Sequence, residues 1–110
     1  MIDENKYIKL AEELGFKVTK DLYNLYDACI SVYADEILIS MYNIPTGKAT
    51  VYDYNKFKLD DNGELTDEGD DFSGTKLYDF EDVKVEFIKI AKKIKSLRIE
   101  EKMKKIEGDF

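Results

Sequence analysis

Residues 28–54 read ACISVYADEILISMYNIPTGKATVYDY, and this stretch decides the fold. It contains three runs rich in β-branched and aromatic residues, a composition typical of β-strands. The connection at 34–36 is short, and the connection at 43–47 holds the only proline of the chain together with a glycine, so both predict chain reversals. The sequence therefore predicts an antiparallel sheet built from the strands Ala28–Tyr33, Ile37–Tyr42 and Ala49–Tyr54.

Helical periodicity flanks these strands on both sides. From Asp3 to Leu14, apolar residues recur three, four and seven positions apart, and Gly15 is suited to end the helix. From Phe80 to Ile106 the same periodicity continues over a much longer helix. We therefore predict an α+β fold in a single domain, residues 1–110, with a short N-terminal helix, an antiparallel sheet of three to four strands and a long C-terminal helix packed on one face.

The segments between these elements carry shorter patterns. Phe16–Thr19 alternates apolar and polar residues and predicts a short strand, whereas Lys20–Asp27 fits either a helical turn or a packed loop. The dipeptide Asn62-Gly63 is typical of tight hairpins, so residues 57–59 are expected to pair back with Leu65.

The composition excludes several kinds of catalytic and metal site. The chain has 110 residues, no histidine, no tryptophan and one cysteine. A Ser-His-Asp or Cys-His catalytic site and a Cys/His zinc site therefore cannot be built from it. Cys29 cannot form a disulfide within the chain, which fits the reducing cytoplasm. We expect no catalysis, no cofactor and no bound metal, and neither an export signal nor a membrane span.

Charge is unevenly distributed along the chain. The net charge is −7, yet residues 53–82 carry eleven acidic and three basic residues while residues 83–110 carry nine basic and five acidic ones. We predict an exposed, mobile acidic loop over about 60–75. Its carboxylates would contact a protein partner, and further acids flank it at Asp53, Asp79, Glu81 and Asp82. The loop carboxylates are Asp60, Asp61, Glu64, Asp67, Glu68, Asp70 and Asp71.

Three interpretations of this acidic loop remain open. Its carboxylates can imitate the charges of a nucleic-acid backbone and occupy a basic groove on a nucleic-acid-binding protein. Alternatively, the loop is a solvated segment, or it faces the basic final helix within the molecule. A calcium loop starting at Asp60 is a poor fit, because its sixth position, normally glycine, is Leu65.

The predicted C-terminal helix has two apolar stripes. The first runs from Phe80 to Leu97 and suits burial against a sheet. The second lies on a different side of the helix and includes Val85 and Ile88. At the C-terminal end it continues as Ile99, Met103 and Ile106, where the first stripe has ended. This second stripe is expected to pack on the first helix, to form the interface of a two-fold homodimer, or to merge with the first stripe through a kink near Ser96.

Tyrosines concentrate in and beside the predicted strands, where outward-facing rings favour binding to other molecules. They are Tyr23, Tyr26, Tyr33, Tyr42, Tyr52 and Tyr54. Rings that stack nucleic-acid bases usually lie among basic residues, whereas acidic residues surround these in the sequence. With the negative net charge, this pattern predicts no direct binding of nucleic acid and no binding to membranes.

Three stretches give the chain a resemblance to other small proteins. They are KYIKLAEELGF at 6–16, ISVYADEILISMY at 30–42 and FEDVKVEFIKIAKKIKSLRIEEKMKKIE at 80–107. In composition and layout they resemble small acidic accessory proteins of phages and mobile elements of low-GC Gram-positive bacteria, a population that includes anti-CRISPR inhibitors. The resemblance implies a protein of the bacterial cytoplasm that inhibits a host-defence nucleoprotein. The alternative hypothesis is a homo-oligomeric accessory or structural protein assembled through the C-terminal helix.

Overall fold

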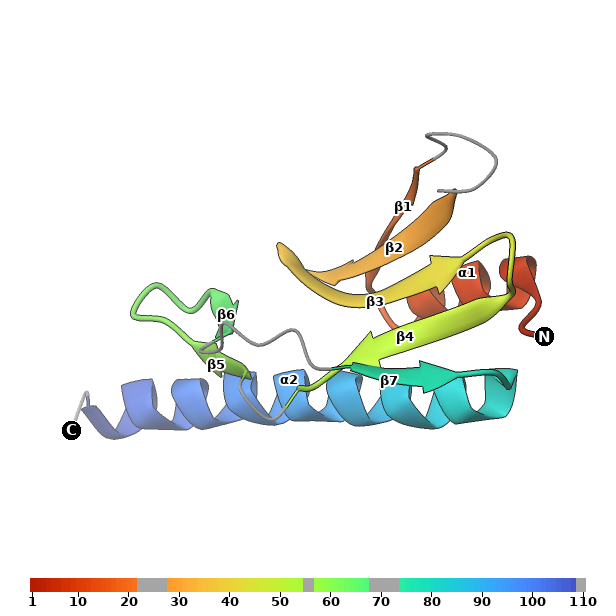
Figure 1. Ribbon diagram of the computed structural model, residues 1–110. Helices are drawn as coiled ribbons and strands as arrows, with labels where there is room; N and C mark the ends of the chain where they lie inside the picture. The colour runs from red at the N-terminus through yellow and green to blue at the C-terminus, as the bar shows by residue number, and fades with distance from the viewer. Residues whose placement is uncertain (22–27, 55–56, 68–73, 109–110) are drawn as a thin grey trace.

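The computed structural model describes residues 1–21, 28–54, 57–67 and 74–108, and for Asp67 and residues 105–108 it describes the backbone alone. The fold is α+β, as predicted (Figure 1). Its elements in chain order are α1 (Glu4–Glu13), β1 (Lys17–Asp21), β2 (Cys29–Ala34), β3 (Ile37–Asn43), β4 (Lys48–Tyr52), β5 (Phe57–Leu59), β6 (Leu65–Asp67), β7 (Gly74–Leu77) and α2 (Phe80–Gly108).

The main sheet is antiparallel and has the strand order β1-β2-β3-β4-β7, while β5 and β6 form a separate hairpin. It has five strands rather than three to four, because β7 adds to the edge at β4, with Val51 opposite Thr75. The sequence predicted no strand between the acidic loop and the final helix. β7 is short and largely exposed, so it lacks the apolar alternation that reveals a strand.

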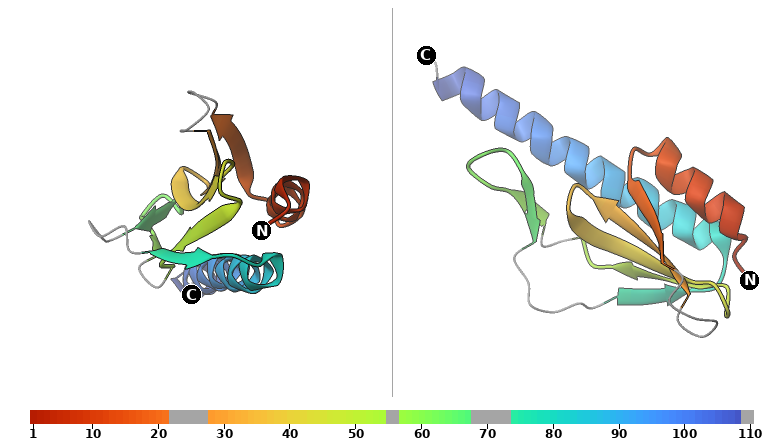
Figure 2. Two further views of the ribbon diagram at one scale, coloured as in Figure 1. Left: turned by 45° about the vertical axis from the view of Figure 1, so that its right-hand side comes forward. Right: turned by 90° about the horizontal axis from the view of Figure 1, so that it is seen from above.

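Both helices cover the same face of the main sheet (Figure 2). Facing side chains of β2 and β3 pair in register there, with Ile30 opposite Tyr42 and Val32 opposite Ser40. The first stripe of α2 is buried against this face as predicted, and Phe87 makes ring contacts with the aromatic residues of α1 and of the segment before β1. The buried stripe residues of α2 are Val83, Phe87, Ile90 and Ile94.

A chain of buried hydroxyl groups ties α1 to the sheet. The Tyr7 hydroxyl lies 2.7 Å from Ser40 Oγ, and Ser40 Oγ donates to the Thr50 carbonyl oxygen at 2.8 Å. Since the serine hydroxyl has one proton and donates it to Thr50, Tyr7 must be the donor to Ser40. Burial raises the pKa of the Tyr7 hydroxyl, which keeps this donor protonated.

The C-terminal half of α2 extends beyond the main sheet, and the β5–β6 hairpin packs on it (Figures 1 and 2). The molecule is elongated, with extents of 57 × 26 × 20 Å. Phe57 and Leu65 are only 4% and 6% exposed, so the hairpin is anchored by its own apolar residues. We call the hairpin, residues 57–67, together with residues 95–104 of α2, the arm. In the part of the chain that the structure describes, no helix is both long and apolar enough to cross a membrane.

Candidate functional site

The turn of the β5–β6 hairpin is held by the Asp60 carboxylate. Its Oδ1 accepts hydrogen bonds from the backbone N–H groups of Asn62 and Glu64, each at 2.9 Å. Gly63 adopts a φ of 80°, in the left-handed region that favours glycine. The predicted pairing across this dipeptide is confirmed by Leu59 opposite Leu65. The first part of the predicted mobile loop is therefore a structured hairpin, and Asp60 is one of the residues that shape it.

The acidic residues predicted to form one surface lie in different places. Asp61 and Glu64 are exposed at the hairpin tip, whereas for Asp67 only the backbone is described. Glu68, Asp70 and Asp71 lie outside the described residues. The flanking acids Glu81 and Asp82 lie in the first turn of α2, twenty residues before Glu101, or about 30 Å at the rise of an α-helix. They therefore form a second patch, separate from the arm.

A groove of about 550 Å³ runs between the hairpin and α2. Its charged lining comprises four carboxylates and two lysines, so the acidic segment and the basic helix do face each other in part. A Cβ built on Gly63 would lie 3.4 Å from a carboxylate oxygen of Glu101, which shows how closely the hairpin tip approaches α2. The lining residues are Lys58, Leu59, Asp60, Asp61, Leu97, Glu100, Glu101 and Lys104.

The second apolar stripe of α2 stays at the surface. Ile99 is 51% exposed and Met103 is 55% exposed, as is Val85 at 50% near the other end of the helix. The stripe therefore does not pack on α1, and α2 is a single helix through Ser96, so it does not merge with the first stripe through a break there. The side chain of Ile106 lies outside the described part. The third explanation, the interface of a two-fold homodimer, stays a prediction.

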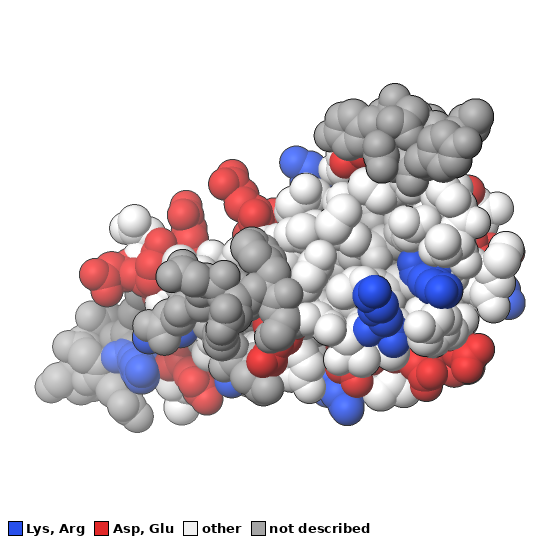
Figure 3. All heavy atoms as spheres, viewed as in Figure 1, with Lys and Arg blue, Asp and Glu red and all other residues white. Residues whose placement is uncertain are grey.

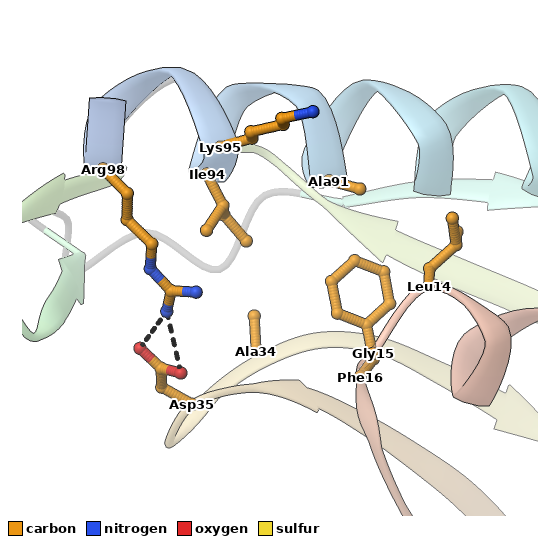
Figure 4. A pocket seen from close by; sticks show the side chains of 9 residues that line it. All are labelled: Leu14, Gly15, Phe16, Ala34, Asp35, Ala91, Ile94, Lys95 and Arg98. Carbon is orange, nitrogen blue, oxygen red and sulfur yellow. Dashed lines mark hydrogen bonds and ion pairs between the residues drawn. The ribbon is translucent and has the colours of Figure 1, made fainter. Parts of the chain in front are cut away.

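A pocket of about 230 Å³ lies where the arm leaves the main body (Figure 4). Phe16, Ala91 and Ile94 give it apolar walls, and Arg98 bridges its rim to Asp35 at 3.0 and 3.1 Å. Asp35 occupies the β2–β3 turn with a φ of 54°, a conformation that aspartate tolerates better than most residues. An apolar pocket with a charged rim is suited to an apolar side chain of a partner.

The sequence did not predict this pocket, because it joins three segments that are far apart in the chain. Its lining comes from residues 14–16 between α1 and β1, from the end of β2 with its turn, and from the middle of α2. In the sequence, Arg98 is one of the nine basic residues of the segment 83–110. No local pattern distinguishes it from its neighbours, since only the packing of α2 against the β2–β3 turn brings it to Asp35.

Among the described residues, no group of three or more cysteine or acidic side chains is close enough to hold a metal ion. The single thiol, Cys29, is half-buried on β2. Comparisons of the chain with protein families, curated proteins and solved structures find no match. The arm, the exposed stripe and the pocket are therefore interpreted from their own geometry.

Proposed function

We propose that this protein is a non-enzymatic module that binds another protein through the arm, by presenting carboxylates to a basic site on the partner. The observation that carries the proposal is the hairpin tip, where Asp61 and Glu64 are exposed on a turn held by Asp60. A tip shaped before binding loses less conformational entropy when the partner is met. Exposed carboxylates also steer a basic partner during approach.

In its sharper form, the proposal is an inhibitor of a host-defence nucleoprotein that acts like an anti-CRISPR protein. Support comes from the resemblance to phage and mobile-element proteins and from the carboxylates of two elements that line one groove on the arm. Two lysines in the same groove, Lys58 and Lys104, reduce the local negative charge. The surface is therefore matched to a partner with basic and acidic groups in a fixed pattern, rather than to any cation-rich protein.

The test uses the immobilised protein and the heparin-retained proteins of a Gram-positive bacterial lysate as the probe. Asp61→Asn with Glu64→Gln removes two charges from the arm, and Glu81→Gln with Asp82→Asn removes two at the start of α2. We expect the arm variant to lose the retained protein and the control variant to keep it. Retention should also fail at about 1 M salt, where the Debye length is about 3 Å. Equal retention by both variants, or retention that survives the salt, contradicts the proposal.

A second candidate function is that of a homo-oligomeric accessory protein, and the half-exposed Ile99 and Met103 favour it. Apolar side chains next to each other on a helix face are stabilised when a second copy covers them. Light scattering of the wild-type protein and of Ile99→Asp with Met103→Asp tests this candidate. A dimer that the substitutions convert to a monomer supports it, and a wild-type monomer excludes it.

A further inference from the structure

The face of the main sheet opposite the helices carries a depression whose lining differs chemically from that of the arm groove. The register places outward side chains of neighbouring strands side by side, with Thr50 opposite both Met41 and Lys76. Lys48 lies next to this row and is opposite Asn43. These side chains line a depression of about 400 Å³, together with Cys29, Thr46, Tyr52 and Tyr78. Tyr42 also borders it, although its ring packs against Tyr7 on the helix-covered face.

The charge of this depression is opposite to that of the whole protein. The chain has a net charge of −7, yet the ten described residues that line the depression include two lysines and no acidic residue. Figure 3 shows this face, with basic side chains inside a largely uncharged area over β4 and β7 and with acidic side chains at its margins and over the arm. An anion held here would be attracted locally, while a long polyanion would also meet the surrounding negative charge.

Aromatic rings accompany the two amines. Lys48 Nζ lies 5.0 Å from the centre of the Tyr78 ring, a distance at which the ring attracts the cation and helps to hold it in place. Tyr52 is on the same strand as Lys48 and lines the same depression. No acidic residue of the described part lines it, and Asp35 and Glu36 form the β2–β3 turn instead. Tyr52 and Tyr78 therefore share the depression with two lysines.

We propose that this depression binds a nucleoside phosphate, with Lys48 and Lys76 contacting the phosphate and a tyrosine ring contacting the base. The volume falls within the range of small-molecule sites, about 300–1,000 Å³. Ammonium groups bind phosphate oxygens, and aromatic side chains stack on bases without regard to sequence. The surrounding negative charge favours a single nucleotide over a long strand. This site shares no lining residue with the arm groove, so it is independent of the proposed function.

The only cysteine of the chain lines the depression, and it provides the readout. The rate of Cys29 alkylation by iodoacetamide, an uncharged reagent, is measured with adenosine or uridine monophosphate, and heat of binding is measured by calorimetry. We expect both nucleotides to slow alkylation in a saturable way at up to about 10 mM, a range that detects affinities near 1 mM. Adenosine alone and inorganic phosphate alone should slow alkylation equally only at roughly tenfold higher concentration, since each lacks one of the two contacts.

Matched lysine variants assign the effect to the depression. Lys48→Gln and Lys76→Gln should each weaken protection about tenfold, whereas Lys92→Gln, on the exposed face of α2, should leave it unchanged. Protection is expressed as the ratio of rates with and without nucleotide in each variant, so that any change in thiol reactivity cancels. Unchanged alkylation, with or without heat of binding, overturns the proposal. So does protection that Lys76→Gln retains, or protection by an oligonucleotide at far lower concentration than the mononucleotide.

Discussion

In the hydrogen-bonded series from Tyr7 through Ser40 to the Thr50 carbonyl oxygen, we predict that losing the Ser40 hydroxyl costs more stability than losing the Tyr7 hydroxyl. Ser40→Ala leaves the Tyr7 hydroxyl, on a fully buried residue, without its acceptor, and it also removes the donor to Thr50. Leaving a buried polar group unpaired costs about 1–3 kcal/mol, and an ordinary hydrogen bond contributes about 1 kcal/mol. We therefore expect Ser40→Ala to lower the free energy of unfolding by about 2–3 kcal/mol.

Tyr7→Phe should cost much less. It removes the donor, and Ser40 keeps its own proton on the Thr50 carbonyl oxygen. The expected loss is about 1 kcal/mol, that of one hydrogen bond. In the Ser40→Ala background the same change removes the unpaired hydroxyl, so it should be neutral or stabilising.

Urea unfolding of the two single variants and the double variant measures the coupling between these residues. We expect the double variant to be no less stable than Ser40→Ala, which corresponds to a coupling of at least about 1 kcal/mol. Losses that simply add, to within about 0.5 kcal/mol, would refute the hydrogen bond between Tyr7 and Ser40.

Three further predictions concern stability. Burial raises the pKa of Tyr7 above its usual value near 10, so an unfolded chain loses this proton at a lower pH than the folded one. The free energy of unfolding should therefore fall above about pH 10, by up to about 1.4 kcal/mol per pH unit for this group, and Tyr7→Phe should reduce that fall in urea titrations. Arg98→Ala breaks an ion pair with Asp35 whose side chains are 51% and 44% exposed, so solvent screening limits the loss to less than about 1 kcal/mol; a loss above about 2 kcal/mol would show a larger role. Phe87→Ala should cost about 3–5 kcal/mol by thermal or urea unfolding, because this fully buried ring contacts the rings of both Tyr7 and Phe16; a loss below about 1 kcal/mol would contradict the assigned core.

Local patterns in the sequence were sufficient for most of the fold. The stripe that includes Phe87 predicted the buried face of α2, and Asn62-Gly63 predicted the β5–β6 hairpin, because both signals depend on residues within a few positions of one another. Strand β7 was missed, since Gly74–Leu77 is short and its pairing partner β4 lies more than twenty residues earlier in the chain.

The candidate site residues were harder to predict than the fold, because their arrangement depends more on tertiary contacts. Charge counting selected Asp61 and Glu64, which are exposed, and also Asp60, whose carboxylate holds the turn. Lys48 and Lys76 lie 28 positions apart and meet only because β7 pairs with β4. Without a prediction of β7, the sequence could not predict that these two lysines lie on one face of the sheet.

The central claim is that the arm is the protein-binding surface, and hydrogen exchange on a complex tests it most directly. Backbone exchange is compared for the protein alone and for its complex with a protein retained from the heparin-binding fraction. We expect slower exchange in residues 57–67 and 95–104, with the main-sheet strands β3, β4 and β7 unchanged. Slower exchange confined to the main sheet, or an arm that exchanges equally fast in both samples, would contradict the claim.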